Sequence, residues 1–513
     1  MHRDEGPGLR RVGDTGLLLE LSGLAEVLSV QAQLQEHPVE GQVDVVAAAR
    51  TVLVTVRTPD QVLPLAARLR RMDTSRPVER DDALVVIEVL YDGEDLADVA
   101  RHTGLSEEAV VGAHTGTPWT AAFGGFAPGF VYLTGGDPRL EVPRRDSPRT
   151  AVPAGSVALA GAFSSVYPRR SPGGWQLLGR TGAVLWDDHR ADPALIRPGN
   201  RVRFEAVREV IEVSPSAASR AGQQGDAGLV VTTPGLRSAV QDLGRPGRMA
   251  LGVAGSGALD RASLRQANRL VGNPAGAAGI ESLNGGLGLR ALQDQVLAVT
   301  GAAVELVVST PEGLDREVPF CAPFLLRAGE TLEQSAPAEG LRAYTAVRGG
   351  VLVEQTLGSS STDSMSGLGP PLLVPGTELT VGAPEPGSVV GEAELPREPR
   401  SPEVLRVVPG PRQDWFDDGE LARLCGEDWT VTSQSDRIGL WLDGPALRRS
   451  RDGELPSEGT VPGALQIPPS GLPVLFLADH PVTGGYPVIA VVVAADLDRA
   501  AQLPPGSVVR FTV

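Results

Sequence analysis

The sequence predicts a β-rich α+β protein of two halves, each combining a β-barrel domain with a further α/β or β-rich domain. Three observations lead to this expectation. The chain has 513 residues, which is enough for about three or four domains of ordinary size. Glycine (62 residues) and proline (43 residues) together form about one fifth of the chain, so turns are frequent and long helices are few. The third observation is an internal repeat that relates the two halves.

The repeat consists of three landmarks that occur in the same order in each half. Each half has a Val-Pro segment, then a Gly-Gly-aromatic turn, and then a closing Pro-Gly segment that ends in phenylalanine. Ordered landmarks at similar spacing are typical of duplicated domains, so we expect two related barrels with the functional site in a cleft between them. The landmarks of the first and second halves are, in order, 152–161, 173–175 and 198–204, and 461–471, 484–486 and 505–511.

Strand and helix patterns divide each half further. Residues 1–80 mix strand-like segments (16–21 and 52–56) with helix-like segments (24–35 and 59–71), which is typical of a small α/β domain. A strong strand pattern follows from about residue 85. The expected order is the α/β domain at 1–80, a barrel at 81–213, a linker at 214–228, a first domain of the second half at 229–395 and a second barrel at 396–513.

A pair of short helices is expected between Asp95 and His114, with Gly104 ending the first helix and Ser106 capping the second. This pattern also matches the outline of a DNA-binding helix-turn-helix. Because the chain is acidic and few cations flank the pair, we interpret it as two helices that pack on the barrel.

The charge balance is acidic, with 63 Asp and Glu residues and a formal net charge of −17. A surface of this sign repels nucleic acid and anionic membranes, so neither is expected as a partner. The longest apolar run, 488–495, is too short to span a bilayer, and no signal-peptide pattern follows the N-terminus, so we expect a cytoplasmic protein. The two cysteines, Cys321 and Cys425, have no metal-ligand spacing, and no metal site is predicted.

The sequence contains no lysine, so all 46 of its cationic residues are arginine. This absence excludes P-loop nucleotide binding, protein kinase activity, Schiff-base chemistry and a covalently attached biotin, because each requires a lysine amine. An anionic substrate would therefore be bound by arginine side chains and by backbone N–H groups in glycine turns.

The first half carries a stretch in which glycine turns and arginines alternate, and it predicts a carboxylate or phosphate pocket. The alternative is a set of tight hairpins in which the glycines serve only the backbone. His114 is a candidate catalytic base, with a structural histidine as the alternative. The candidate binding residues of this half are Arg145, Arg149, Ser171, Gly173, Gly174, Trp175 and Arg180.

In the second half, polar residues gather at several turns. Asp260 precedes a helix-like segment and is either a binding residue or only the cap of that helix. The segment 478–487 combines an acid, an imidazole, a hydroxyl and a double-glycine turn, which makes it the most site-like decapeptide of the chain. Its candidate catalytic residues are Asp479, His480 and Thr483. The candidate binding residues of this half are Gln241, Asp242, Arg245, Arg348, Gly484, Gly485 and Tyr486.

Long motifs in both halves resemble one known protein family. GFAPGFVYL, VPRRDSPRTAVPAGSVALAG, YPRRSPGGWQLLGRT and PGNRVRF resemble the B subunit of 5-oxoprolinase, also called allophanate hydrolase subunit 1 or KipI. TPGLRSAVQDLGRPG, SGALDRASLRQANRLVGNP, AYTAVRGG, LGSSSTDS, SDRIGLWLDGP and DHPVTGGYPVIAVV resemble the C subunit, which is the KipA or biotin-dependent carboxyltransferase-like family. The chain therefore looks like a fusion of 5-oxoprolinase subunits B and C, and the resemblance implies that the barrels are cyclophilin-like.

The resemblance also implies ATP-dependent hydrolysis of 5-oxo-L-proline to glutamate, with ATP and Mg²⁺ as cofactors and no covalent biotin. The implied partner is a separate LamB/YcsF-like protein, the A component of 5-oxoprolinase, and a homo-oligomer is left open. On this view the arginines and the turn 171–175 face Asp479, His480 and Thr483 across the cleft. Two other function classes stay open, which are a KipI-like inhibitor of a histidine kinase and a carboxyltransferase module of a urea carboxylase-like system.

Overall fold

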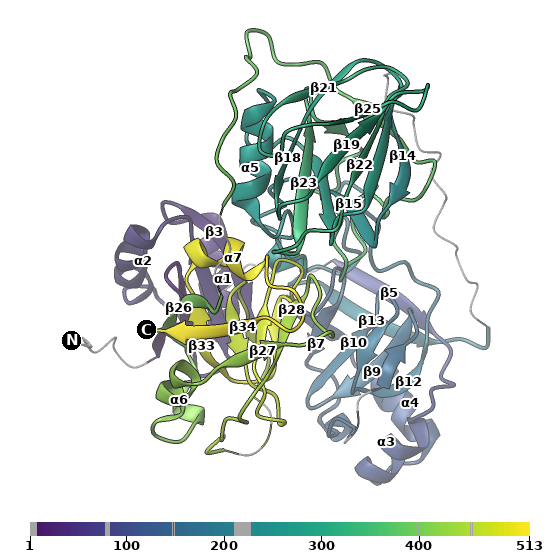
Figure 1. The fold of residues 1–513 in the computed structure, drawn as a ribbon. Helices are drawn as coiled ribbons and strands as arrows, with labels where there is room; N and C mark the ends of the chain where they lie inside the picture. Colours follow the sequence, from purple (N-terminus) through teal and green to yellow (C-terminus); the bar gives the residue numbers. More distant parts are fainter. Residues whose placement is uncertain are drawn as a thin grey trace.

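The structure is a computed structural model that describes residues 8–76, 83–145, 147, 149–209, 227–397, 401–451, 453 and 455–513. Four parts follow one another along the chain (Figure 1). A small sheet with helices is followed by a first barrel, then by a domain of two packed sheets, and finally by a second barrel. The expected linker at 214–228 falls almost entirely outside the described residues.

The N-terminal unit is a four-stranded antiparallel sheet of order β1-β2-β4-β3, with two helices packed on one face. Its residues alternate between the two faces of the sheet, which gives each face an aliphatic surface to bury. The elements are β1 (Leu9–Val12), β2 (Gly16–Glu20), α1 (Leu24–Glu36), β3 (Gln42–Ala47), β4 (Thr51–Val56), η1 (Pro59–Gln61) and α2 (Val62–Leu69).

The first barrel has seven strands in the order β12-β9-β10-β7-β6-β13-β5, and its first and last strands in sequence pair in parallel. Reciprocal backbone hydrogen bonds of 2.8 and 2.9 Å between Leu90 and Arg180 join the two edges. The elements are β5 (Leu84–Val89), α3 (Leu96–Thr103), α4 (Glu107–Gly116), β6 (Trp119–Gly124), β7 (Val131–Thr134), η2 (Pro138–Leu140), β8 (Arg149–Val152), β9 (Ser156–Ala160), β10 (Phe163–Val166), β11 (Ser171–Gly173), β12 (Gln176–Arg180) and β13 (Arg201–Ala206).

The helix pair of this barrel ends and begins as predicted. Gly104 adopts φ +70° after α3, and the Ser106 side chain accepts a hydrogen bond from the Ala109 amide at 3.2 Å. Both helices contact the first barrel, α3 at β12 and α4 at β13, and Val99 and Val110 lie in its core. The pair therefore completes the barrel core, as the packing interpretation predicted.

The third part packs a seven-stranded sheet, β20-β19-β22-β17-β14-β25-β24, against a five-stranded sheet, β15-β16-β23-β18-β21, and α5 covers the outer face of the smaller sheet. Its elements are β14 (Ala227–Pro234), β15 (Arg237–Gln241), η3 (Met249–Leu251), α5 (Arg261–Leu270), β16 (Gly279–Leu283), β17 (Leu287–Ala291), β18 (Gln295–Gly301), β19 (Leu306–Ser309), β20 (Asp315–Glu317), β21 (Phe324–Leu326), β22 (Thr331–Gln334), β23 (Arg342–Val347), β24 (Val351–Leu352) and β25 (Glu378–Val381).

The second barrel is closed, with the order β26-β33-β30-β31-β28-β27-β34. When the first barrel is followed from β5 across its joined edge to β12, its order is β5-β12-β9-β10-β7-β6-β13. This order matches that of the second barrel from β26 to β34, so each strand has an equivalent in the other barrel. The elements are β26 (Glu403–Pro409), η4 (Gln413–Trp415), α6 (Glu420–Gly426), β27 (Trp429–Val431), β28 (Gly439–Asp443), β29 (Glu458–Gly459), β30 (Ala464–Gln466), β31 (Val474–Phe476), β32 (Thr483–Gly484), β33 (Val488–Val492), η5 (Ala494–Asp496), α7 (Leu497–Ala500) and β34 (Val508–Thr512).

The equivalence extends beyond the main strands. Each barrel carries a separate two-stranded ladder, β11 with β8 in the first and β32 with β29 in the second, at its Gly-Gly turn. Trp119 and Trp429 begin equivalent strands, and each indole donates a hydrogen bond to the carbonyl five residues earlier, at 3.1 and 2.9 Å. The predicted α+β fold with one barrel in each half is confirmed.

The two halves are not separate bodies, because the N-terminal unit lies against the second barrel (Figure 1). Val46 and Leu53 of its sheet share a buried apolar cluster with Val474 and Val491 of that barrel. Asp44 adds a polar link to the third part, since it accepts hydrogen bonds from the backbone amides of Gly247 and Met249 at 3.1 and 2.9 Å. The first and last parts of the chain therefore fix each other's position beside the first barrel.

Candidate functional site

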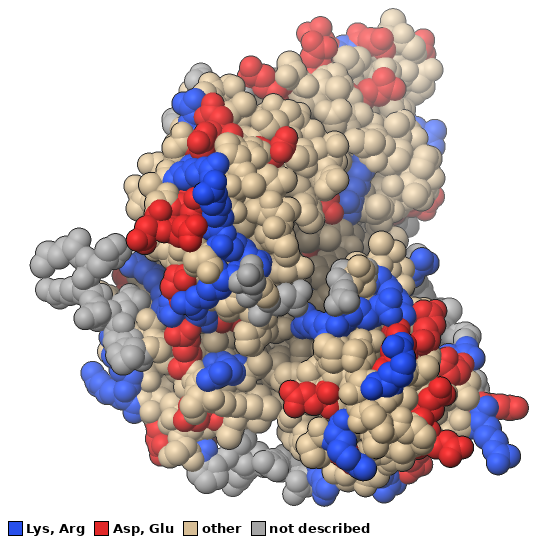
Figure 2. Space-filling view, turned by 90° about the horizontal axis from the view of Figure 1, so that it is seen from below, with Lys and Arg blue, Asp and Glu red and all other residues tan. Residues whose placement is uncertain are grey.

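A cavity of about 170 Å³ lies between the two barrels and is lined by residues of both. Both Gly-Gly turns contribute to its wall, Gly173 and Gly174 from the first barrel and Gly484 and Gly485 from the second. Seen from below in Figure 2, a hollow separates the two lower lobes, and arginines alternate with acidic residues around it. The cleft predicted from the repeat is present at the place where the repeat's turns meet.

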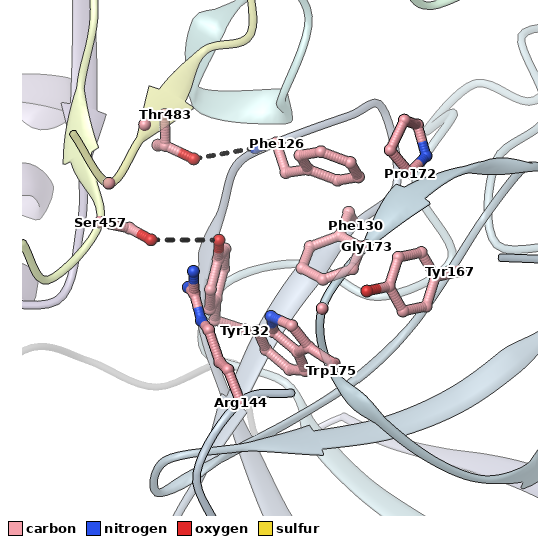
Figure 3. Close-up of a pocket in the computed structure, with 13 residues that line it drawn as sticks. Phe126, Phe130, Tyr132, Arg144, Tyr167, Pro172, Gly173, Trp175, Ser457 and Thr483 are labelled. Carbon is pink, nitrogen blue, oxygen red and sulfur yellow. Dashed lines mark hydrogen bonds between the residues drawn. The ribbon is translucent and has the colours of Figure 1, made fainter. Parts of the chain in front are cut away.

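The first barrel supplies an aromatic wall. Figure 3 shows Phe126, Phe130, Tyr132, Tyr167 and Trp175 around one opening. Phe130 packs edge-to-face on its aromatic neighbours, with ring centroids 5.3 to 5.4 Å apart, which fixes the rings relative to one another. Burial raises the pKa of Tyr167 above its ordinary value, so its hydroxyl stays protonated. The wall can accept a planar or apolar group and offers two phenol hydroxyls.

The second barrel closes the cavity with small polar residues (Figure 3). Thr483 Oγ1 accepts a hydrogen bond from the backbone amide of Phe126 at 3.0 Å, and Tyr132 Oη lies 3.5 Å from Ser457 Oγ. Phe126 has φ +63°, a left-handed conformation that is unfavourable for a residue with a side chain. The contact with Thr483 helps to hold this conformation, so the aromatic wall depends on the second barrel.

Two glycines at the cavity are required for close approach. A Cβ at Gly173 would lie 2.2 Å from the hydroxyl of Tyr167, and a Cβ at Gly125 would lie 2.9 Å from Thr483 Oγ1. At these positions the absence of a side chain lets the backbone lie against the ring and against the opposite barrel.

The predicted arginines are engaged elsewhere. Arg145 and Arg149 both form ion pairs with Asp95 at the start of α3, and Arg180 pairs with Asp92 at 3.0 Å. The arginine that lines the cavity is Arg144, next to Arg145 in sequence. Ser171 precedes the lining residues Pro172 and Gly173 on β11.

The two candidate histidines are buried and neutral. His114 lies in the first barrel's core, where Nδ1 is 2.7 Å from Tyr91 Oη and Nε2 is 2.9 Å from Ser164 Oγ. Burial lowers the pKa of His114 to about 3 and that of His480 to about 4. The Nδ1 of His480 donates to the Pro481 carbonyl at 2.8 Å. His114 therefore matches the structural alternative named for it, with no contact to the cavity.

Asp479 is the centre of a buried polar cluster that is separate from the cavity lining. Its carboxylate accepts hydrogen bonds from Arg437 at 2.9 Å and from the hydroxyls of Ser256 and Ser364 at 2.7 Å. Burial favours the neutral acid, but the charge and hydrogen bonds of Arg437 outweigh it and hold the pKa of Asp479 below its ordinary value. Arg437 also pairs with Glu281, so it links the second barrel to the two-sheet domain.

The remaining candidate residues of the second half mainly form hydrogen bonds with other residues of the protein. Asp242 accepts from Ser359 Oγ and from the Ser360 amide, both at 2.7 Å, and Gln241 donates to the Thr362 carbonyl at 2.8 Å. Arg348 donates to carbonyls of Val271 and Ser388, near the end of α5. Asp260 caps α5 by accepting from the Ser263 amide at 2.9 Å, which matches the capping alternative. Tyr486 follows the second Gly-Gly turn.

Arg245 differs from these neighbours because it is buried and only partly hydrogen-bonded. It donates to the Ser361 carbonyl, while its Nε and Nη1 atoms have no partner in the described residues. Composition and spacing give no signal for this arrangement, nor for the role of Arg437 and Glu281. The aromatic wall does have a signal in the GFAPGFVYL motif, although the sequence alone does not predict its rings as ligands.

The described part of the chain contains no group of three or more His, Cys, Asp and Glu side chains arranged to hold a metal ion. None of its helices combines the length and apolar character that crossing a bilayer requires.

Known proteins resemble each half of the chain. Residues 7–196 match the family described as carboxyltransferase domain, subdomain C and D, and residues 251–513 match carboxyltransferase domain, subdomain A and B. Similarity to the C subunit of 5-oxoprolinase from Escherichia coli strain K12 is 36% identity over 286 residues, which covers 55% of this chain and 90% of that protein. Similarity to the B subunit of 5-oxoprolinase from Escherichia coli O157:H7 is 38% identity over 207 residues, which covers 39% and 95%.

A solved structure matches both halves at once. The crystal structure of TTHA0988 superposes with a TM-score of 0.86 at 36% identity, and the match covers 97% of this chain and 99% of that one. The chain belongs to the carboxyltransferase-domain family and joins, in one polypeptide, regions similar to the B and C subunits of 5-oxoprolinase.

Proposed function

We propose that this chain is the B and C component of an ATP-dependent 5-oxoprolinase in the cytoplasm. The reaction converts 5-oxo-L-proline, ATP and water to L-glutamate, ADP and phosphate, together with a separate LamB/YcsF-like protein as the A component. One structural observation carries the proposal, which is that the B-like and C-like regions contribute equivalent Gly-Gly turns to one cavity. A site built from both regions explains why the two act as one unit.

The cavity residues fit a nucleotide. The rings of Phe130, Tyr132 and Trp175 offer faces and edges on which a purine packs, and Arg144 supplies a guanidinium for phosphate oxygens. The turns at Gly173 and Gly484 let the ligand approach the backbone closely. The described lining contains no carboxylate, so Mg²⁺ would be held by the phosphates rather than by this wall.

Opening a lactam by water is slow because the amide is stabilised by resonance. Transfer of the γ-phosphoryl group of ATP to the amide oxygen would release ADP and make the carbonyl carbon a better electrophile, so that water adds there, the ring C–N bond breaks and phosphate leaves. The chain's own contribution is to bind and orient the reactants and to exclude bulk water with its aromatic wall. Tyr167, which stays protonated, can donate a hydrogen bond but cannot act as a base at neutral pH.

The test is a reconstituted assay. The full chain is mixed with a LamB/YcsF-type protein, 5-oxo-L-proline, ATP and Mg²⁺, and ADP and glutamate are measured. We expect equal amounts of both products, and none when either protein is omitted. Formation of neither product with both proteins present would overturn the proposal.

A matched pair of variants assigns the nucleotide to the cavity. Loss of a charge-assisted contact in Arg144→Ala should raise the KM for ATP about tenfold. Arg139→Ala removes an exposed arginine that donates its hydrogen bonds to Asp137, and it should leave the KM unchanged. Equal KM values for both variants would place the nucleotide elsewhere.

The family description supports a second candidate, carboxyl transfer between a carrier and a small amide. The chain would then act on a carboxylated carrier supplied in trans, since it has no lysine to carry biotin itself. Release of the carboxyl group from carboxybiotin by the chain, without ADP formation, would select this function over the first.

A further inference from the structure

A second group of polar side chains, distinct from the cavity lining, comes together from three separate segments. Arg169 lies in the loop between β10 and β11, four residues before Gly173 of the cavity. Arg245 follows β15, and Asp363 lies in the loop that precedes β25. We call Arg169, Arg245 and Asp363 the inner triad.

The loop that carries Asp363 positions both guanidinium groups. It is a tight turn in which the Asp363 amide donates to the Leu368 carbonyl and the Gly367 amide donates to the Asp363 carbonyl, both at 2.9 Å. A Cβ at Gly367 would lie 3.1 Å from Arg169 Nη1, and a Cβ at Gly369 would lie 3.3 Å from Arg245 Nη2. Both arginines therefore lie directly against this one turn.

The triad is largely buried but incompletely hydrogen-bonded. Arg245 is 2% exposed and Asp363 is 1% exposed. Among the described residues, four of the triad's buried atoms have no hydrogen-bond partner. These atoms are Arg169 Nη1, Arg245 Nε, Arg245 Nη1 and Asp363 Oδ2.

The buried charges next to the triad are paired, in contrast to the triad itself. Arg437 reaches Asp479, Glu281 and the Gly257 carbonyl. Within the described chain no ion pair joins Asp363 to Arg169 or Arg245, although Asp363 is close enough to stabilise their charged forms. The opposite charges are therefore near each other without direct contact.

Leaving these atoms without partners is costly. A buried polar group without a hydrogen bond destabilises the folded protein, and a charged group does so more strongly. Burial, together with the nearby charge of Asp479, raises the pKa of Asp363 above its ordinary value. Burial also lowers the pKa of both triad arginines. A ligand that supplies acceptors to the two guanidinium groups and a donor to Asp363 would give hydrogen-bond partners to all three side chains.

We propose that the inner triad binds a small molecule that carries a carboxylate group and, next to it, an amide N–H. The carboxylate accepts hydrogen bonds from Arg169 and Arg245, and the amide N–H donates to Asp363 Oδ2. The proposal deepens the oxoprolinase function and rests on it for the identity of the ligand, since 5-oxo-L-proline has both groups on one ring. The triad thereby assigns the substrate to a position next to the nucleotide cavity, since Arg169 lies four residues before Gly173 of the cavity lining.

The experiment is calorimetric titration of the full chain, without ATP or a second protein. Four probes separate the two contacts, which are 5-oxo-L-proline, N-methyl-5-oxoproline without the N–H, cyclopentanecarboxylate without the amide, and 2-pyrrolidone without the carboxylate. We expect 5-oxo-L-proline to bind at least tenfold more tightly than each of the other three. Equal affinity for 5-oxo-L-proline and its N-methyl analogue would overturn the contact with Asp363.

Two variants connect the probes to the residues. Asp363→Asn keeps Oδ1, which accepts from the amides of Met365 and Ser366 at 2.9 Å, and replaces the unpartnered oxygen with a donor. It should lower the affinity for 5-oxo-L-proline at least tenfold and remove the preference over the N-methyl analogue. Thermal unfolding of the variant shows that the turn is retained.

Arg169→Ala should lower the affinity for 5-oxo-L-proline and for cyclopentanecarboxylate by the same factor and leave the affinity for 2-pyrrolidone unchanged. Arg170→Ala removes the adjacent exposed arginine and is the matched control, expected to bind all four probes normally. Unchanged binding in Asp363→Asn and Arg169→Ala would mean that the inner triad has only a structural role with water as its partner, and it would contradict the proposal. Binding that follows these expectations, without ATP turnover in the reconstituted assay, would retain the triad and reject the oxoprolinase function.

Discussion

The two barrels share one strand order, yet they meet their surroundings differently. The first barrel buries a neutral histidine among aromatic rings and directs a second aromatic group into the cavity. The second barrel instead buries a charged cluster, in which Arg437 connects Asp479 to Glu281 of the two-sheet domain. Duplication preserved the scaffold, while the loops between equivalent strands acquired separate tasks. The first barrel provides the aromatic wall of the cavity, and the second provides a charged anchor to the two-sheet domain.

The largest expected effect concerns the anchor. Replacing Arg437 by Met leaves the buried carboxylate of Asp479 without its cation and leaves Glu281 with only the longer ion pair to Arg342 at 3.8 Å, which should lower the free energy of unfolding by about 3–5 kcal/mol. Urea denaturation measures this change. The control Arg510→Ala removes an exposed ion pair with Asp428 and should cost less than about 1 kcal/mol. Similar losses in both variants would mean that the second barrel has no special anchor.

The buried histidines predict acid sensitivity in both barrels. The folded-state pKa of His480 is about 4 and that of His114 about 3, both below the ordinary 6.5, so the unfolded chain binds these protons first. Stability contributed by His480 is complete above pH 6.5 and falls as the pH drops toward 4, by on the order of 3 kcal/mol. Unfolding measured from pH 7 to 4 should show this slope, and His480→Asn should reduce it. A slope unaffected by the substitution would contradict the buried neutral histidine.

The equivalent tryptophans test the duplication itself. Trp119→Phe and Trp429→Phe each remove one buried indole hydrogen bond to a carbonyl five residues earlier. Each should cost about 2 kcal/mol in unfolding free energy, through the unpaired carbonyl and the smaller ring. Chemical denaturation of both variants gives the comparison. Losses that differ by more than about 1 kcal/mol would show that the two positions are not structurally equivalent.

The smallest effect is expected at the contact between the barrels. Thr483→Val keeps the shape of the side chain but removes the acceptor of the Phe126 amide, which should cost about 1 kcal/mol in stability. Because Phe126 then loses a restraint on its left-handed conformation, the KM for ATP should rise although the stability changes little. An unchanged KM for ATP would show that the aromatic wall does not depend on this contact with the second barrel.

Local sequence patterns predict the strands, the two helices beside the first barrel and the repeat, because each depends on residues close together in the chain. Gly104 and Ser106 fix helix ends through local geometry, and the Gly-Gly turns mark equivalent positions in both barrels. The cleft follows from the repeat. The partners of individual side chains cannot be predicted in this way, since Arg145 and Arg149 form hydrogen bonds with Asp95, which lies about 50 residues earlier in the chain.

Local sequence patterns do not predict the inner triad either, because its residues are far apart in the chain. Arg169, Arg245 and Asp363 are separated by 76 and 118 residues in the chain, and Arg169 meets the other two only through the packing of the first barrel against the two-sheet domain. The sequence predicts Arg245 as a polar binding residue at a turn, while Arg169 stands in a family motif without an assigned partner. Only the structure shows that buried nitrogen atoms of both arginines lack acceptors among the described residues.

The central claim is that both barrels act on one ligand, and a double-mutant cycle on the full chain tests it most directly. The affinity for ATP with Mg²⁺ is measured by calorimetry in Arg144→Ala, in Thr483→Val and in the double variant. If the two barrels share the ligand, the effects should be coupled by about 1 kcal/mol. Effects that add within about 0.5 kcal/mol, or affinities equal to that of the unmodified chain, would contradict a shared site.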